Sequence, residues 1–235
     1  MKLVKVCGMR EAANILEIEQ AGADWMGFIF YPESPRFVHE VPDYLPRKAK
    51  RVGVFVNASK EKINETASLF GLDLVQLHGN ESPEFCENIR RSGVKVIKSF
   101  RVGDEFKEEE VEPYHGKCDY FLFDTQTSLY GGSGEKFNWE TLLNYRGNTF
   151  FLLSGGITPG DAEALKTFSY PKCIGVDINS KFEISPAVKD AKLVKQFIKV
   201  IKKPGNIPWQ HHVLCYDSRQ QSEYQRHDIF EGVRS

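Results

Sequence analysis

Eight short apolar runs alternate with amphipathic segments over most of the chain, and this alternation constrains the fold more than any other feature of the sequence. Most of the runs are continuously apolar, which is typical of parallel strands covered on both faces. The expected strands are Leu3–Val6, Trp25–Phe30, Val52–Val56, Leu72–Leu77, Val94–Phe100, Tyr120–Phe123, Thr149–Leu153 and Cys173–Ile178. Eight such units in about 200 residues match the size of a (β/α)8 barrel. The pattern therefore predicts an α/β protein, a single (β/α)8 TIM barrel.

The amphipathic segments have ends that are typical of helices. Ser82-Pro83 and Thr158-Pro159 each place a capping residue before a proline at the first helical position. Gly71 and Gly93 follow two segments at the point where a left-handed residue ends a helix. The expected helices are Glu11–Gln20, Lys60–Phe70, Pro83–Arg91, Trp139–Tyr145, Pro159–Lys166 and Asp190–Lys202. The segment after Phe30 is the least clearly marked, because prolines interrupt it.

A doubly wound open sheet is the alternative architecture, since both folds alternate strands with helices. Candidate functional residues follow most of the strands instead of gathering at one point, which favours the closed barrel. The periodic pattern fades after Lys203-Pro204-Gly205. We therefore expect residues 1–204 to form the barrel domain and residues 205–235 to form a C-terminal extension whose role is open. The extension gives only weak support for a metal site, because its candidate ligands fit no standard spacing; these are His211, His212, Cys215 and His227.

The composition disfavours several classes of function. The 31 basic and 32 acidic residues are mixed along the chain, with a net charge of -1 and no basic stripe that would bind nucleic acid. No apolar run approaches the ~18–20 residues of a membrane span, and the first residues lack the apolar region of a secretory signal. The five cysteines include no CxxC pair, which favours a reducing compartment. We expect a cytoplasmic protein without nucleic-acid or membrane partners.

Glycine-rich turns follow the last two expected strands. Ser154-Gly155-Gly156 comes after the seventh run, and Asn179-Ser180 comes after the eighth, which contains Gly175. Loops after strands seven and eight of a barrel commonly bind phosphate. Glycines let backbone N–H groups approach the anion, although the same glycines could simply make tight turns. We favour the phosphate site, which predicts a phosphorylated small-molecule substrate.

Two strand ends carry groups that can transfer protons. Because side chains alternate along a strand, Lys5 and Cys7 face the barrel interior if Val4 and Val6 face the helices. A nearby lysine would lower the pKa of the Cys7 thiol and raise its thiolate fraction. Asp124 ends the sixth run just before a glycine-rich loop. A base and an acid on different strands predict proton transfer without a metal or a cofactor. The alternative is a core thiol and a helix-capping aspartate.

Two further polar positions are candidates for binding a substrate. Gln76 and His78 lie on one face at the end of the fourth run, although a histidine at such a position is more often a rim residue with its own partners. Arg36 follows two prolines in the loop after the second run, where a stiffened backbone suits it to hold a carboxylate with two hydrogen bonds. Arg36 could equally be a surface residue in an ion pair.

The ordered set of motifs resembles the phosphoribosylanthranilate isomerase family of tryptophan biosynthesis. The resemblance covers residues 2 to 200, with Ser154, Asn138 and Met9 as departures from the family pattern. The matching segments are Lys5-Val6-Cys7-Gly8, Gly22-Ala23-Asp24, Gly27-Phe28-Ile29-Phe30, Ser34-Pro35-Arg36, Val52-Gly53-Val54-Phe55-Val56-Asn57, Gln76-Leu77-His78-Gly79, Asp124, Tyr130-Gly131-Gly132-Ser133-Gly134, Phe137-Asn138-Trp139, Ser154-Gly155-Gly156-Ile157, Gly175-Val176-Asp177 and Ser185-Pro186-Ala187-Val188-Lys189-Asp190.

The resemblance implies an Amadori rearrangement and a role for each candidate residue. Asp124 would be the general acid that opens the ribose ring, and Cys7 the general base that removes the proton from C2′. Arg36 would hold the anthranilate carboxylate, and Asp177 would orient a ribose hydroxyl. The phosphate would be bound by Gly155, Gly156, Asn179 and Ser180. No cofactor is expected, and the chain is expected to be a monomer or a homodimer.

Three alternatives stay open at this point. The related isomerase of histidine biosynthesis usually uses two carboxylates, so the thiol of Cys7 argues against it. A non-catalytic barrel that binds a phosphorylated ligand would lack the acid or the base, and both are present. An interaction protein that works through the extension would depend on residues 206–235.

Overall fold

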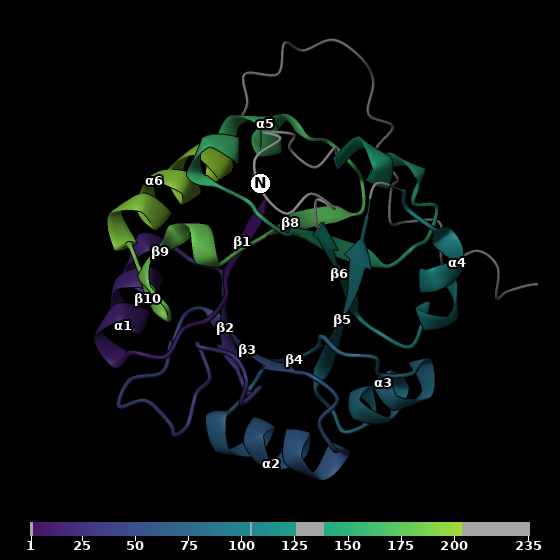
Figure 1. Ribbon diagram of the computed structural model, residues 1–235, viewed down its shortest axis with the longest axis horizontal. Coiled ribbons are helices and arrows are strands. Elements are labelled where there is room, and N and C mark those ends of the chain that lie inside the picture. The colour runs from purple at the N-terminus through teal and green to yellow at the C-terminus, as the bar shows by residue number, and fades with distance from the viewer. Residues whose placement is uncertain (1, 104, 126–138, 204–235) are drawn as a thin grey trace, which may run out of the picture. The chain divides into compact units, whose positions relative to one another are not determined.

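Eight parallel strands close into one barrel (Figure 1). The computed structural model describes residues 2–103, 105–125 and 139–203. The strands are β1 (Leu3–Val6), β2 (Trp25–Ile29), β3 (Lys50–Phe55), β4 (Leu74–Leu77), β5 (Lys95–Val102), β6 (Tyr120–Thr125), β7 (Phe150–Ser154) and β8 (Cys173–Ile178). Strand β1 pairs in parallel with both β2 and β8, which closes the ring. The predicted closed barrel is therefore confirmed, and the open sheet is excluded.

Three of the α-helices in the described residues begin at a side-chain cap that the sequence supplies. The α-helices are α1 (Ala12–Ala21), α2 (Lys60–Phe70), α3 (Pro83–Arg90), α4 (Glu108–Val111), α5 (Ala162–Thr167) and α6 (Ala191–Lys202). The side chains of Ser59, Ser82 and Asp190 accept hydrogen bonds from backbone N–H groups in the first turns of α2, α3 and α6. Gly71 ends α2 at a φ of 57°, which a glycine adopts without strain.

Several connections differ from a simple alternation of strands and α-helices. No helix joins β2 to β3, where Pro42 and Pro46 interrupt the chain. Residues Trp139–Asn144 form a 3-10 helix (η2) instead of an α-helix, and two more short ones, η1 (Glu112–Tyr114) and η3 (Pro159–Asp161), precede β6 and α5. After β8 the chain makes a turn, η4 (Ser180–Phe182), and then an unexpected antiparallel hairpin of β9 (Glu183–Ser185) and β10 (Val188–Lys189).

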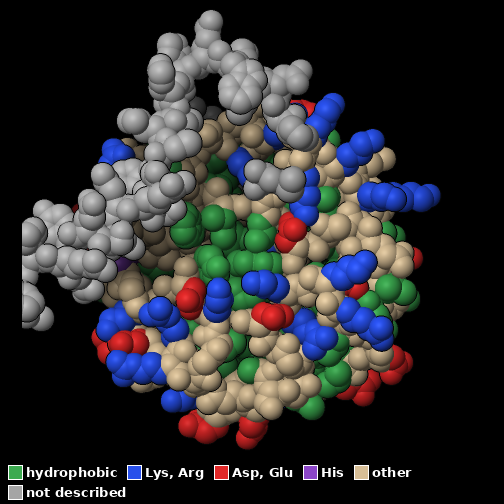
Figure 2. Space-filling view, turned by 180° about the vertical axis from the view of Figure 1, so that it is seen from behind, with side chains coloured by type: hydrophobic (Ala, Val, Ile, Leu, Met, Phe, Trp, Pro, Cys, Tyr) green, Lys and Arg blue, Asp and Glu red, His purple; other side chains and the backbone are tan. Residues whose placement is uncertain are grey.

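Apolar side chains pack in two separate layers, one on each side of the strands. Val4 and Val6 belong to the outer layer, where they join Ile15 of α1 and Phe197 of α6. The inner layer fills the barrel and consists of Trp25, Val52, Leu74, Ile97, Leu122 and Leu152. In the view from behind, hydrophobic side chains occupy the centre of the ring and charged side chains surround it (Figure 2). The barrel is therefore a packed core with no open channel.

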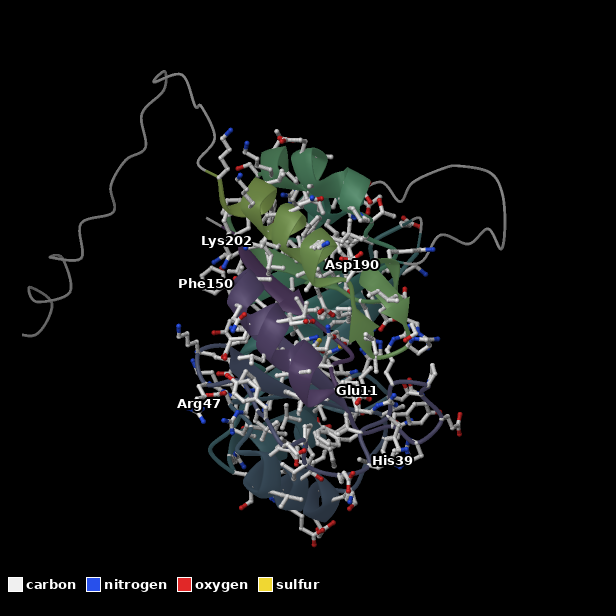
Figure 3. The ribbon with its side chains drawn as sticks, turned by 90° about the vertical axis from the view of Figure 1, so that its left-hand side faces the viewer. Glu11, His39, Arg47, Phe150, Asp190 and Lys202 are labelled. Carbon is white, nitrogen blue, oxygen red and sulfur yellow. The ribbon has the colours of Figure 1, made fainter. Side chains whose placement is uncertain are left out.

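The packing leaves one end of the barrel for polar groups. Figure 3 shows the caps Glu11 and Asp190 toward one end of the molecule, while Lys202 at the end of α6 and Phe150 at the start of β7 lie toward the other. Helix amino termini and strand carboxyl ends therefore meet at the same end. In (β/α)8 barrels, this is the end that carries the active site.

Candidate active site

A cavity of about 310 Å³ opens where the strands end. Its walls come from residues at or near the ends of β1, β2, β3, β4, β6, β7 and β8. The polar and glycine residues that line it include Cys7, Gln76, His78, Asp124, Ser154, Gly155, Gly156, Asp177, Asn179 and Ser180. All the predicted site residues except Arg36 thus line a single cavity.

Cys7 lies against the wall of the cavity with only 5% of its surface exposed. Gly27 on the neighbouring strand makes room for it, because a Cβ at Gly27 would lie 2.7 Å from Sγ of Cys7 and 3.2 Å from Nζ of Lys5. Burial raises the pKa of the Cys7 thiol; Lys5 opposes this rise, but the carboxylate of Asp177 adds to it. Lys5 therefore acts in the expected direction, but the expectation of a pKa below the ordinary value is wrong, because burial outweighs the effect of Lys5.

Lys5 lowers the pKa of Cys7 less than an unpaired cation would, because it already has a carboxylate partner. Barrel closure pairs Lys5 on β1 with Asp177 on β8, and Nζ of Lys5 lies 2.9 Å from Oδ1 of Asp177. Burial disfavours the charge on Lys5, but the attraction of Asp177 and Cys7 outweighs it, so the pKa of Lys5 is raised. Lys5 therefore carries its charge in the core, between a thiol and a carboxylate.

Asp124 lies beside His78 across the cavity wall. Oδ2 of Asp124 is 3.5 Å from Nε2 of His78, and both side chains are partly exposed. The amide nitrogen of Gln76 lies 2.9 Å from Nδ1 of His78. When Gln76 donates this hydrogen bond, Nδ1 is the acceptor and the ring hydrogen sits on Nε2, facing Asp124. His78 is thus the polar neighbour of the candidate acid.

The turn after β7 has the glycine backbone that the sequence predicted, whereas the turn after β8 contains no glycine, because Gly175 lies within β8. Gly155 and Gly156 have φ values of 93° and 59°, in the left-handed region where glycine is favoured. A Cβ at Gly156 would meet nothing within 4 Å. Glycine is therefore favoured here by its backbone conformation and not by a lack of space. Asn179 precedes the turn η4, and its Oδ1 accepts a hydrogen bond of 2.6 Å from Nζ of Lys189.

Arg36 differs from the other predicted residues, because the structure pairs it with Glu183. Its Nε lies 2.8 Å from Oε1 of Glu183, and its Nη2 lies 2.6 Å from Oε2. Glu183 stands on β9, and Lys189 on β10 also contacts it, at 2.6 Å. Burial would raise the pKa of Glu183, but Arg36 and Lys189 hold it at about 2. The sequence analysis missed Glu183 and Lys189; both lie in or beside the matched segment Ser185–Asp190, yet neither carries a local signal of pairing with Arg36.

A second cavity of about 490 Å³ adjoins the first and shares His78 and Asp124 with it. A buried ion pair stands behind it: Nζ of Lys98 lies 3.2 Å from Oε2 of Glu81. Glu81 also accepts N–H bonds from Asn57 and Gly79, and Lys98 donates to three backbone carbonyls. This pair fastens together the ends of β3, β4 and β5.

The described residues include neither a cluster of metal ligands nor a membrane-spanning helix. The described residues contain no cluster of three or more His, Cys, Asp or Glu side chains that could hold a metal ion. None of the helices in the described ranges has the length and apolar character of a membrane span. The loop Tyr130–Gly134, Asn138 and the extension at 205–235 lie outside the described residues.

The fold and the cavity define a (β/α)8 barrel enzyme with its site at the carboxyl ends of the strands. A model of the family described as N-(5'-phosphoribosyl)anthranilate (PRA) isomerase matches residues 4–200. The chain belongs to this family, and it is an isomerase.

Relatives and solved structures agree with this assignment. The chain is 52% identical to N-(5'-phosphoribosyl)anthranilate isomerase of Phocaeicola vulgatus over 201 residues, which cover 86% of this chain and 98% of that protein. The crystal structure of the Thermotoga maritima enzyme is 35% identical, with a TM-score of 0.72, and the match covers 86% of this chain and 99% of that one. Another phosphoribosyl anthranilate isomerase was solved with reduced 1-(o-carboxyphenylamino)-1-deoxyribulose 5-phosphate; it is 32% identical, with a TM-score of 0.69 and coverage of 86% and 99%.

Proposed function

We propose that this isomerase converts N-(5-phosphoribosyl)anthranilate into 1-(2-carboxyphenylamino)-1-deoxyribulose 5-phosphate, as a step of tryptophan biosynthesis. One observation carries the proposal: Cys7 and Asp124, from strands far apart in the sequence, line the same cavity as the glycine turn at 155–156. A base, an acid and an anion-binding turn are what this reaction requires on a single phosphorylated sugar.

The first half of the reaction opens the sugar ring. Asp124 donates a proton to the ring oxygen, the bond between that oxygen and C1′ breaks, and the nitrogen lone pair forms a C=N bond to C1′. The carboxylate that results lies next to Nε2 of His78, at 3.5 Å. A hydrogen on Nε2 stabilises the new negative charge, so His78 supports the acid after it has given up its proton.

The second half moves a proton from carbon. Cys7 as thiolate removes the hydrogen from C2′, and the electron pair forms a C1′=C2′ bond that neutralises the iminium nitrogen. The enolamine then loses its hydroxyl proton and gains a proton at C1′, which gives the ketone. Each proton transfer accelerates the reaction by about 10²–10⁴.

Cys7 must lose its proton before it can act, and its buried setting opposes this. Lys5 is the cation beside it, but the carboxylate of Asp177 opposes the effect of Lys5 on the thiol. A ribose hydroxyl that donates to Asp177 disperses the carboxylate charge, so that Lys5 acts more fully on Cys7. Asp177 thereby links the position of the sugar to the state of the base.

The remaining candidate residues hold the two ends of the substrate. The backbone at Gly155 and Gly156, with Asn179 and Ser180, binds the phosphate. Arg36 binds the anthranilate carboxylate. A cytoplasmic location and a monomeric or homodimeric state stay predictions, as does the domain boundary at residue 204.

Two assays test the proposed function directly: complementation of an auxotroph and turnover by the purified protein. The gene for the chain should restore growth without tryptophan to an auxotroph that lacks only this isomerase, and the purified protein should convert N-(5-phosphoribosyl)anthranilate without an added cofactor. A chain lacking residues 206–235 serves as the comparison. Failure of a well-folded full-length protein in both assays would overturn the proposed function, and activity only with the extension present would favour the interaction alternative.

A further inference from the structure

The hairpin β9–β10 delivers a carboxylate that is fixed from several sides. Oε1 of Glu183 accepts bonds from Nε of Arg36, Nζ of Lys189 and the backbone N–H of Ala187, and Oε2 accepts one from Nη2 of Arg36. The Glu183 side chain is only 6% exposed. Its charge is kept at neutral pH, because its pKa is held at about 2. Four donors on one buried carboxylate leave it little freedom to move away.

The hairpin is itself anchored to the barrel. Asn14 on α1 makes a two-way pair with the backbone of Lys189: Nδ2 donates to the carbonyl at 2.9 Å, and Oδ1 accepts from the N–H at 2.7 Å. Ala187 in the turn has a φ of 69°, which is unfavourable for a residue with a side chain and persists only where surrounding contacts hold it. The carboxylate of Glu183 is therefore presented from a fixed support.

Glu183 uses only one edge of the Arg36 guanidinium. A guanidinium has a side edge formed by Nε and Nη2 and an end edge formed by Nη1 and Nη2, and each edge can hold a carboxylate. Glu183 occupies the side edge. Nη1 has no hydrogen-bond partner among the described residues, and the Arg36 side chain keeps 18% of its surface exposed. The end edge is thus still able to bind a second carboxylate.

The arrangement lies next to the base and carries an excess positive charge. A Cβ at Gly8 would lie 2.6 Å from Cδ of Arg36 and 2.8 Å from Oδ1 of Asn179, so Arg36 packs against the backbone that follows Cys7. Arg36 and Lys189 share the single carboxylate of Glu183, which leaves one positive charge uncompensated. An anionic ligand group is favoured there.

We propose that Glu183 is a positioning residue that holds Arg36 by its side edge and so aims its end edge at the carboxylate of the substrate. This inference rests on the proposed function, because it takes the anthranilate carboxylate as the group that Arg36 receives. Glu183 does not touch the substrate and acts through Arg36. Lys189 completes the support by keeping Glu183 charged and in place.

The test measures how one isosteric substitution changes the binding of two ligands. The ligands are the reduced product, which carries the carboxyl group on its ring, and the same molecule without that carboxyl group. Glu183→Gln should weaken binding of the carboxylate ligand about tenfold or more, because a neutral amide no longer aligns the guanidinium, and should change binding of the other ligand less than about twofold. Glu87→Gln is the matched control, since Glu87 pairs with Lys117 and Arg91 on the surface away from the cavity.

A double-mutant cycle separates positioning from general damage. In an Arg36→Ala background, Glu183→Gln should cause no further loss of the carboxylate ligand, because the residue through which it acts is gone. Equal losses for both ligands, or a further loss in the Arg36→Ala background, would show a structural role and overturn the inference. Tighter binding of the carboxylate ligand would show that Glu183 competes with the substrate, which also overturns it. If the wild-type protein neither turns over the substrate nor distinguishes the two ligands, the proposed function fails and the inference fails with it.

Discussion

Two buried lysines on different parts of the barrel wall have similar ion pairs and different surroundings. Lys5 on β1 pairs with Asp177 at 2.9 Å, and Lys98 on β5 pairs with Glu81 at 3.2 Å. The remaining donors of Lys98 bind backbone carbonyls, whereas Lys5 lies beside the thiol of Cys7. Lys98 binds one carboxylate and three backbone carbonyls, and so holds the ends of neighbouring strands together. Lys98 also lies near a thiol, that of Cys86, but the thiol beside Lys5 is the one that lines the cavity. Lys5 can therefore change the chemistry of a group in the site.

The candidate acid and the candidate base also differ in their surroundings, because one is partly exposed and the other is enclosed. Asp124 is partly exposed and its neighbour His78 is too, so the acid can regain a proton from solvent. Cys7 is enclosed by Gly27, Lys5 and the strand walls. The base therefore depends on its fixed neighbours, and the acid depends less on them. Variants on the two sides of the cavity should fail for different reasons.

The largest effects are expected at the reacting groups themselves. Cys7→Ser and Asp124→Asn should each lower turnover by about 10²–10⁴, because each removes one proton transfer. Binding of the reduced product should change little, since neither group holds the phosphate or the carboxylate. Turnover and ligand titration of the purified variants check this, and near-normal rates in both variants would end the acid and base assignment.

Lys98→Met should reduce the free energy of unfolding by about 3–5 kcal/mol, because it leaves the carboxylate of Glu81 buried without its partner. Urea unfolding measures the change. The double variant Lys98→Met with Glu81→Gln should recover part of the loss, since the unpaired charge is removed. Turnover per folded molecule should fall far less than in Cys7→Ser. A stable Lys98→Met protein with low turnover would contradict this, because it would show that Lys98 acts on the reaction, as we propose for Lys5.

Lys5→Met should raise the pKa of Cys7 further, because it removes the cation that opposes the effect of burial. At a given pH the thiolate fraction then falls, so alkylation of Cys7 by iodoacetamide should begin at a higher pH than in the wild type. Mass spectrometry of the Cys7 peptide follows this one thiol among the five cysteines. An alkylation profile that is unchanged, or moved to lower pH, would mean that Lys5 does not act on Cys7.

The smallest effect is expected at Gly27, whose replacement sharpens the contrast between enclosed base and open acid. Gly27→Ala places a methyl group 2.7 Å from Sγ of Cys7, which should cost about 1–3 kcal/mol of stability and displace the thiol. Gly103→Ala is the control, because a Cβ there meets nothing within 4 Å. Thermal unfolding and turnover are measured for both variants, and only Gly27→Ala should show a loss. Equal stability and equal turnover of the Gly27→Ala and Gly103→Ala variants would show that the residues around Cys7 move easily to admit a methyl group.

The sequence predicts the barrel well because its signals are local. The bounds of β1 and β8 match the expected runs, and the other strands differ by one or two residues at their ends. Continuous apolar runs mark strands covered on both faces, so no tertiary knowledge is needed. The helix at Trp139–Asn144 was predicted, but its 3-10 form was not, and neither was the hairpin β9–β10.

The candidate site is less predictable because its charges pair across the barrel. Lys5 and Asp177 meet only when β8 closes against β1; burial, with Asp177 adding to it, then outweighs Lys5 and raises the pKa of Cys7. Arg36 and Glu183 are separated by 147 positions, and no local pattern joins them. Strand ends show which residues reach the cavity, while partners and charge states follow from the fold.

The central claim is that Cys7 and Asp124 act on two neighbouring atoms of one bound sugar. A crystal structure of the full-length protein with the reduced product tests it most directly. We expect Sγ of Cys7 next to C2′ and the carboxyl group of Asp124 next to the oxygen that closes the ribose ring, with the phosphate at Gly155 and Gly156. A ligand whose phosphate lies elsewhere, or whose C2′ faces away from Cys7, would contradict the account.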